Sequence, residues 1–348
     1  MMLKYYCSFL LIFMIGFAKG QQVQLLHSGN RISLRGLSVV DNNTIWVSGN
    51  KGMVGKSLDG GNTWKWLKVK GFDSTDFRDI EAFNDTTAII MSVAEPAYIL
   101  KTTDGGVNWK VVYENKTKGM FLDAMDFWDD KNGFVVGDPI HNNFFIAYTT
   151  NAGNKWKQQS AYTTKPKQQL AQQGKLSETK DFISDSAEAC FASSGTNIRM
   201  ISDKSFVLVT GGSASSVFIN NKKSKLPLLQ GKESTGANSI AINKNTIIVV
   251  GGDFTSKDAT DSNCCYSTDA GKTWQLCSTA PHGYRSCVEY LEDKTWISCG
   301  LNGVDISVDN GKNWNLIDTD SFNSCRKAKH GRAVFFVGSN GRIGKLSK

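Results

Sequence analysis

The stretch Ser57-Leu58-Asp59-Gly60-Gly61-Asn62-Thr63-Trp64 decides the fold, because variants of it recur along the chain. In each copy an Asp or Asn can accept hydrogen bonds from backbone N–H groups, and a glycine allows the positive φ of a tight turn. The final Trp begins a strand, where its ring can fill the seam between neighbouring sheets. This Asp turn contains no nucleophile or acid–base pair, so it predicts structure and no reaction. The structural positions are Asp59 and Trp64, Asp104 and Trp109, Asn151 and Trp156, Asp269 and Trp274, and Asp309 and Trp314.

The spacing of the Asp turns gives the length of one repeat. Successive Trp residues lie 45, 47 and 40 residues apart, except for a gap of 118 residues after Trp156. Repeats of this length, built from short strands with turn residues between them, are typical of the blades of a β-propeller. Residues 21–348 are therefore predicted to form one all-β, seven-bladed β-propeller. The long gap fits two blades plus an exposed insertion loop at residues 158–186.

The last predicted blade is incomplete, since only three strands follow residue 321 before the chain stops. The segment from Val23 to Leu26 precedes the first blade and belongs to no other repeat. Pairing of this segment with the last blade would close the ring and cover an open sheet edge. We therefore expect the N-terminal strand to close the propeller.

Residues 1–20 have the pattern of an export signal. Lys4 precedes an apolar run from Tyr5 to Ala18, and the small residues Ala18 and Gly20 suit cleavage before Gln21. The run is short for a bilayer span, although a signal anchor is the alternative, and no later stretch is apolar enough to cross a membrane. We predict an exported monomer, periplasmic or secreted, with no transmembrane segment in the mature chain.

Charge and cysteine content narrow the choice of partners. The chain has a net charge of +8, which suits anionic partners, whereas nucleic acid is not expected outside the cell. An exported chain permits disulfides, but the sequence leaves their pairing open, and an odd count leaves at least one thiol free or intermolecular. The cysteine spacing predicts no metal site. The seven cysteines after residue 20 are Cys190, Cys264, Cys265, Cys277, Cys287, Cys299 and Cys325.

Several arginines occupy similar places in the predicted innermost strands. Arg35 and Arg78 lie 14 residues before the end of the next strand, Arg285 lies 15 before it, and Arg199 lies nearby in another blade. Because innermost strands border the central channel, we predict that these four arginines gather at one channel mouth. Their guanidinium groups would bind carboxylates or an acidic peptide tail. The same register assigns the equivalent positions of the other blades to Leu122, Asn197, Asn238 and Asn323.

A structural role for the arginines is the alternative to binding. Each arginine would then pair with a carboxylate of a neighbouring blade, such as Asp79, Asp123 or Asp138, and tie the blades together.

The chain resembles the photosystem II assembly/stability factor family of β-propellers with Asp-box turns. The resemblance rests on the turns together with Phe77-Arg78-Asp79-Ile80, Gly211-Gly212, Val249-Val250-Gly251-Gly252-Asp253 and Gly338-Ser339-Asn340-Gly341-Arg342-Ile343, and it covers essentially residues 22–348. It implies a scaffold that binds a newly made protein subunit, with an arginine patch matched at Arg35, Arg78 and Arg285. Relatives without photosynthesis exist, so the photosystem itself is not carried over.

The rival prediction is an Asp-box glycoside hydrolase, either sialidase-like or glucan-degrading. Such an enzyme needs two carboxylates facing each other across a sugar. Arg31-Ile32-Ser33 lacks the proline of the sialidase signature, and no dinucleotide fingerprint follows a strand and opens a helix. We therefore predict a non-catalytic protein-binding scaffold of the cell envelope without a cofactor. The acidic and phenolic candidates for the rival are Glu81, Asp123, Asp126, Glu289, Tyr284 and Tyr290.

Overall fold

The computed structural model describes residues 21–159, 182–219 and 221–347. The predicted export signal at 1–20 lies outside the described residues, as do residues 160–181 of the predicted insertion. Its two ends are described: β13 (Lys157–Gln158) is exposed, whereas Phe182 is buried against Phe206 and Phe218. The end of the predicted loop is therefore part of the core. In the described part of the chain, no helix is long and apolar enough to cross a bilayer.

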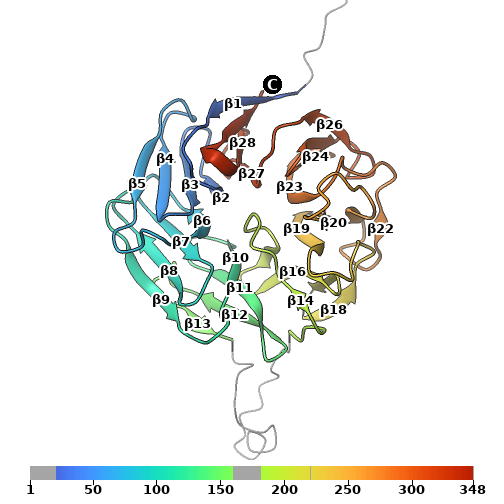
Figure 1. Ribbon diagram of the computed structural model, residues 1–348, viewed down its shortest axis with the longest axis horizontal. Coiled ribbons are helices and arrows are strands. Elements are labelled where there is room, and N and C mark those ends of the chain that lie inside the picture. The colour runs from blue at the N-terminus through green and yellow to red at the C-terminus, as the bar shows by residue number, and fades with distance from the viewer. Residues whose placement is uncertain (1–20, 160–181, 220, 348) are drawn as a thin grey trace, which may run out of the picture.

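The described chain is all β apart from one 3-10 turn, η1 (Ser339–Gly341), and its sheets stand around a central channel as the blades of a propeller (Figure 1). Five sheets have four strands each, and a nine-stranded sheet joins two further units through the pairing of Gly211 with Gly236.

The strands of blades one to three follow chain order from the channel outward. Blade one contains β2 (Leu34–Val39), β3 (Ile45–Gly49), β4 (Met53–Ser57) and β5 (Lys65–Lys68). Blade two contains β6 (Phe77–Ala82), β7 (Ala88–Ser92), β8 (Ala97–Thr102) and β9 (Lys110–Asn115). Blade three contains β10 (Leu122–Phe127), β11 (Gly133–Ile140), β12 (Asn143–Thr149) and β13.

The next three blades repeat this order. Blade four contains β15 (Ile198–Ser202), β16 (Ser205–Gly212), β17 (Ser216–Ile219) and β18 (Lys222–Lys225), with the short β14 (Glu188–Ala189) added beside β16. Blade five contains β19 (Thr235–Asn243), β20 (Thr246–Asp253), β21 (Cys264–Ser267) and β22 (Gln275–Leu276). Blade six contains β23 (Arg285–Glu292), β24 (Thr295–Gly300), β25 (Gly303–Ser307) and β26 (Asn315–Asp318).

Blade seven combines both ends of the chain. Its strands are β27 (Ser324–Lys327), β28 (Val334–Val337), β29 (Ile343–Leu346) and, at the outer edge, β1 (Val23–His27). β1 pairs antiparallel with β29, and Val23 lies opposite Leu346. This N-terminal strand covers the edge that β29 would otherwise expose.

The Asp turns share one set of hydrogen bonds, although the indole bond forms at Trp64, Trp109 and Trp314 and not at Trp156 or Trp274. In blade one, Ser57 Oγ donates to Asp59 Oδ1 at 2.8 Å and accepts from the Gly61 N–H at 2.9 Å. Asp59 Oδ1 also accepts the Thr63 N–H at 2.9 Å, and the Trp64 indole donates to the Gly61 carbonyl at 3.1 Å. The predicted structural role of the turn residues is therefore explained by these contacts. In the other turns the side-chain oxygen likewise accepts the backbone N–H of the residue four positions later, at Asp104, Asn151, Asp269 and Asp309.

The Asp turns also join neighbouring blades. Gly106 has a φ of +85°, and a Cβ there would lie 2.9 Å from Leu67 Cδ1 of blade one. Lys56, one residue before the Asp turn of blade one, donates to the carbonyls of Asp85 and Gly105 in blade two. The seam between blades one and two thus depends on Gly106, whose missing side chain leaves room for Leu67, and on the buried Lys56, which hydrogen-bonds to blade two.

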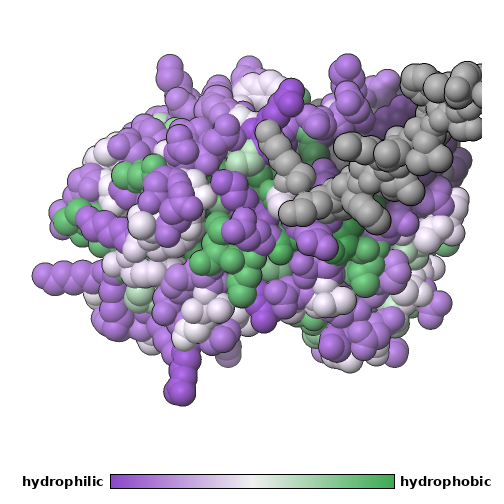
Figure 2. Space-filling view, turned by 90° about the horizontal axis from the view of Figure 1, so that it is seen from above, coloured by the Kyte–Doolittle hydropathy of each residue, from purple (hydrophilic) through white to green (hydrophobic). Residues whose placement is uncertain are grey.

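Hydrophilic side chains cover most of the edge of the ring in Figure 2, and hydrophobic residues form separate patches on it. The core lies between the blades.

Candidate functional site

A β-bulge near the start of the innermost strands sets which side chains face the channel. The antiparallel register shifts at this point in blades one, two, three, five and six. A bulge leaves one residue unpaired and changes the direction of its side chain. The unpaired residues are Arg35, Arg78, Asp123, Asn238 and Ser286.

This register corrects two sequence-based assignments. Leu122 pairs with Gly137 and Arg285 pairs with Gly300, so neither is the bulged residue. The equivalent positions are Asp123 and Ser286, one residue later. A slip of one residue in a strand turns a side chain to the opposite face, and Arg285 consequently points away from the channel.

Arg35 and Arg78 line a cavity of about 450 Å³ at one mouth of the channel, which we call the arginine cavity. Arg35 donates to the Ser193 carbonyl at 3.0 Å, and among the described residues no carboxylate forms an ion pair with it. Arg78 donates from Nε to Asp76 at 2.8 Å. Burial and the nearby positive charge of Arg78 lower the pKa of Arg35. The positive charge of Arg78 thus acts on Arg35, which favours an anion near this pair of side chains.

An aromatic wall completes the arginine cavity. Phe191, Phe254 and Tyr284 stand edge to face, with ring centroids 5.9 Å and 6.3 Å apart, and Phe254 is 42% exposed. Phe121 lies under the Arg78 guanidinium, 5.8 Å from it. One carboxylate, Asp138, also lines the cavity; burial raises its pKa to about 6, and it accepts the Cys190 N–H. The site therefore places the guanidinium of Arg35, which has no carboxylate partner among the described residues, beside exposed apolar surface.

A loop between β14 and β15 reaches into the middle of the ring (Figure 1), and we call Ser193–Thr196 the plug. The Ser193 carbonyl binds Arg35 of blade one, and Ser194 Oγ donates to the Ser286 carbonyl of blade six. Thr196 Oγ1 donates to Ser239 of blade five. Arg35, which binds Ser193, lines the arginine cavity, whereas Arg326, which binds Gly195, lines a different cavity, so the plug lies between the two.

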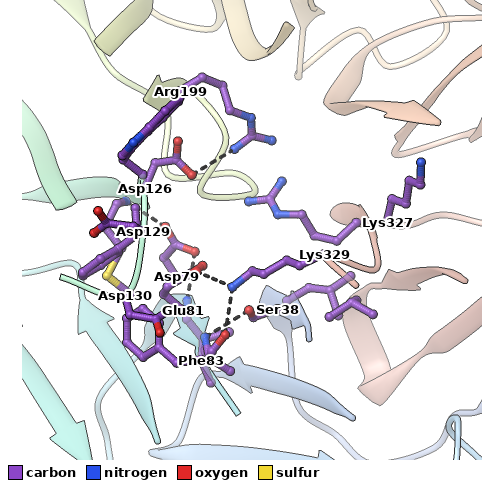
Figure 3. Close-up of a pocket in the computed structure, with 18 of the residues that line it drawn as sticks. Ser38, Asp79, Glu81, Phe83, Asp126, Asp129, Asp130, Arg199, Lys327 and Lys329 are labelled. Carbon is purple, nitrogen blue, oxygen red and sulfur yellow. Dashed lines mark hydrogen bonds and ion pairs between the residues drawn. The ribbon is translucent and has the colours of Figure 1, made fainter. Parts of the chain in front are cut away.

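Beyond the plug lies a second space of about 430 Å³, the ion-pair cavity (Figure 3). Arg199 lies here and not in the arginine cavity; its guanidinium is 3.9 Å from Asp126 and 3.3 Å from Glu289. Figure 3 shows Lys329 directed at Glu81, with which it forms an ion pair. Arg199 therefore has the structural role that was the alternative to binding, because its ion pairs link blades three, four and six.

Two further groups of the ion-pair cavity hold the plug: Arg326, which was not selected from the sequence, and Asp79, which was named there only as a possible partner of the arginines. Arg326 donates to the Gly195 carbonyl at 3.1 Å; burial opposes its charge, but its electrostatic interactions with Cys287 and with the carboxyl groups of Glu289, Asp79 and Asp126 raise its pKa. Burial raises the pKa of Asp79 to about 8, although Asp79 accepts the N–H groups of Ile80 and Met125. Both groups help to fix the plug, since Gly195 also packs against Asp79.

Arg285 is fully buried, and its hydrogen-bond partners all belong to blade six. Its Nε donates to Asp305 at 2.6 Å, and its Nη1 donates to Asn302 at 2.6 Å and to the Tyr284 carbonyl at 2.9 Å. Asp305 is also fully buried. The prediction that four arginines gather at one mouth is therefore corrected to two, Arg35 and Arg78.

Four carboxylates of the ion-pair cavity are poorly suited to glycoside hydrolysis. Glu81, Asp126 and Glu289 each face a cationic side chain, and Asp79 is 2% exposed with both oxygens accepting backbone bonds. A general acid must lie within reach of the substrate to deliver its proton, and the burial of Asp79 keeps its carboxyl group from that contact despite its raised pKa. In the described part of the chain, no three His, Cys, Asp or Glu side chains are arranged to hold a metal ion.

Comparison with known proteins agrees with this architecture. The BNR/Asp-box repeat model matches residues 266–276, which contain the Asp turn of blade five. Among curated proteins, none matches the sequence.

Solved structures with a similar fold include a structure described as YCF48 bound to D1 peptide, at 15% identity and a TM-score of 0.63, with 94% of this chain and 97% of that chain covered. YCF48 from Cyanidioschyzon merolae gives 16% identity and a TM-score of 0.62, with 93% and 98% covered. The Pan2 WD40 domain of Neurospora crassa gives 11% and 0.59, with 93% and 95% covered. At sequence identities this low, the structural similarity establishes the fold alone. The chain is a β-propeller with Asp-box turns, and its fold is similar to that of the photosystem II assembly factor YCF48.

Proposed function

We propose that this protein is a non-catalytic scaffold that captures a peptide segment through a carboxylate bound in the arginine cavity. The observation that carries the proposal is the position of Arg35, which lies beside Arg78 and has no carboxylate partner among the described residues. A buried or half-buried cation without a counter-ion attracts an anion from the solvent.

The geometry favours a peptide carboxylate over a simple inorganic anion. Guanidinium groups bind carboxylates through paired N–H donors. The aromatic side chains of Phe121, Phe191 and Phe254 provide an apolar surface next to those donors. An apolar side chain next to a carboxylate, as at the end of a peptide, would use both parts of the cavity.

Catalysis has less support than binding. Three of the acidic candidates for hydrolysis, Glu81, Asp126 and Glu289, lie in the ion-pair cavity, where each faces a lysine or arginine. The arginine cavity has a single carboxylate, Asp138. The remaining exposed carboxylates that line the ion-pair cavity are Asp129 and Asp130, so the glycosidase alternative would have to rest on these two and not on the predicted candidates.

The setting is part of the proposal. A similar fold has been solved as YCF48 bound to D1 peptide, which is a statement about that protein. For this chain, the apolar run after Lys4 supports export, so the partner would be a protein met outside the cytoplasm. We propose that the mature chain acts as a monomer there.

The test is a double substitution, Arg35→Ala with Arg78→Ala, assayed on an array of synthetic peptides with free C-termini. A matched control is Arg31→Ala with Arg332→Ala, because both of these arginines are exposed and the change in charge is the same. We expect the affinity for the bound peptides to fall at least about tenfold in the first variant and to stay unchanged in the control. Equal binding by both variants, with both folded by circular dichroism, would refute the proposal.

A further inference from the structure

Two cysteines face each other across the hairpin that carries the Asp turn of blade five. The Cys277 N–H donates to the Cys264 carbonyl at 3.2 Å, and the neighbouring pair in the register is Cys265 with Leu276. Cys277 therefore continues the ladder directly opposite Cys264. Directly opposite residues of an antiparallel pair have Cβ atoms about 4.5–5.5 Å apart, and disulfides join Cα atoms about 4.4–6.8 Å apart.

The two thiols lie on the same face of the sheet. Cys264 is buried in the seam with Trp296 and Trp314 of blade six, and Cys277 packs on the same cluster. Cys265 belongs to a different cluster on the other face of the sheet. Its alternating direction removes Cys265 as a competitor for Cys277.

Blade one shows what normally occupies these positions. Counting from the Asp turn, Val54 and Leu67 are the equivalents of Cys264 and Cys277, and they lie opposite each other in the register. An aliphatic pair thus fills the seam in blade one, whereas blade five has two thiols. The cysteine pair encloses residues 265–276, which include the whole Asp turn.

We propose that Cys264 and Cys277 form a disulfide that closes the Asp-turn hairpin of blade five. This inference is independent of the peptide-binding proposal, because it rests only on the strand register and burial. A low-molecular-weight disulfide such as oxidised glutathione is a sufficient oxidant.

The exchange proceeds in two balanced steps. Cys277, which is half-buried while Cys264 is 2% exposed, loses its proton to solvent and attacks the glutathione disulfide. This step forms a mixed disulfide and releases one glutathione thiolate. Cys264 then loses its proton, attacks Cys277 Sγ and releases the second glutathione. Burial, together with the neighbouring Cys277, raises the pKa of Cys264 well above its usual value, so the second step should accelerate as the pH rises.

Peptide mapping tests this pairing in the full mature chain. After incubation with oxidised glutathione, free thiols are alkylated and the protein is digested with trypsin without reduction. Cleavage after Lys257, Lys272 and Arg285 separates residues 258–272, with Cys264 and Cys265, from residues 273–285, with Cys277. We expect these two peptides to remain linked in the wild type and to separate on reduction.

Cys265→Ala is the matched control, because it removes the adjacent thiol on the other face. The link should persist in Cys265→Ala and disappear in Cys264→Ala and Cys277→Ala. Reduction should lower the melting temperature of the wild type by about 5 °C and leave that of Cys277→Ala unchanged. Loss of the link in Cys265→Ala, or alkylation of both Cys264 and Cys277 in the oxidised wild type, would overturn the proposal.

Discussion

Replacement of Arg285 by Ala should destabilise the propeller without affecting peptide capture. Arg285 and Asp305 are both fully buried, and the substitution would leave the Asp305 carboxylate without its guanidinium partner. Removal of one partner of a buried ion pair costs about 3–5 kcal/mol. Asp305 keeps the His282 ring nitrogen at 2.7 Å, so we expect a value near the lower limit, about 3 kcal/mol.

Urea unfolding followed by tryptophan fluorescence measures this loss. Arg78→Ala is the comparison, since its ion pair with Asp76 is partly exposed and should contribute less than about 1 kcal/mol. Replacement of both partners, Arg285→Met with Asp305→Leu, should recover most of the stability because no buried charge remains. A fully stable Arg285→Ala variant that no longer captures peptide would refute the structural role given to Arg285.

Three further predictions concern the Asp turns and the seams between blades. Gly106→Ala should lower the free energy of unfolding by about 1–3 kcal/mol more than Gly71→Ala in urea titrations, because both glycines have positive φ but only Gly106 meets neighbouring atoms; equal losses would contradict the packing argument. Hydrogen bonds from Thr63 to Asp59 and from Asn108 to Asp104 lower the pKa of each carboxyl group from 3.8 to about 2. The stability that these two carboxylates contribute is therefore fully present above pH 4 and is lost as the pH falls through about 2. Acid titrations of stability should therefore show a shallower fall for Asp59→Asn with Asp104→Asn than for the wild type. Lys56→Met should cost about 1–3 kcal/mol by removing the donor to the Asp85 and Gly105 carbonyls, and an unchanged urea midpoint would show that the lysine does not tie blades one and two.

Local signals explain why the fold was predictable. Each Asp turn is specified by a short stretch that makes its own hydrogen bonds, such as those of Ser57, Asp59 and Thr63. The interval between turns then fixed the blade length, and the spare segment after residue 22 identified the strand that pairs with β29.

The arginine assignments were less reliable because they depended on register. Arg285 lies 15 residues before Gly300, whereas Arg35 lies 14 before Gly49. That difference of one residue was the available signal, and it shifts the channel position to Ser286. Position along a strand says which blade a residue belongs to, but the location of the bulge decides which face it occupies.

The plug could not be predicted from sequence. Ser193-Ser194-Gly195-Thr196 has the composition of an ordinary surface loop, and its position in the channel depends on partners in several blades. The ion pairs of Arg199 with Asp126 and Glu289 likewise join residues up to 90 positions apart.

Binding of matched peptides measured by isothermal titration calorimetry tests the central claim most directly. A peptide selected from the free-acid array is compared with the same sequence ending in a carboxamide. Loss of charge-assisted hydrogen bonds worth about 1.5–3 kcal/mol predicts that the amide binds about 10–150-fold more weakly to the wild type. The difference should vanish in the Arg35→Ala, Arg78→Ala protein. Equal affinity of the two peptides for the wild type, or an array without any free-acid binder, would contradict carboxylate capture in the arginine cavity.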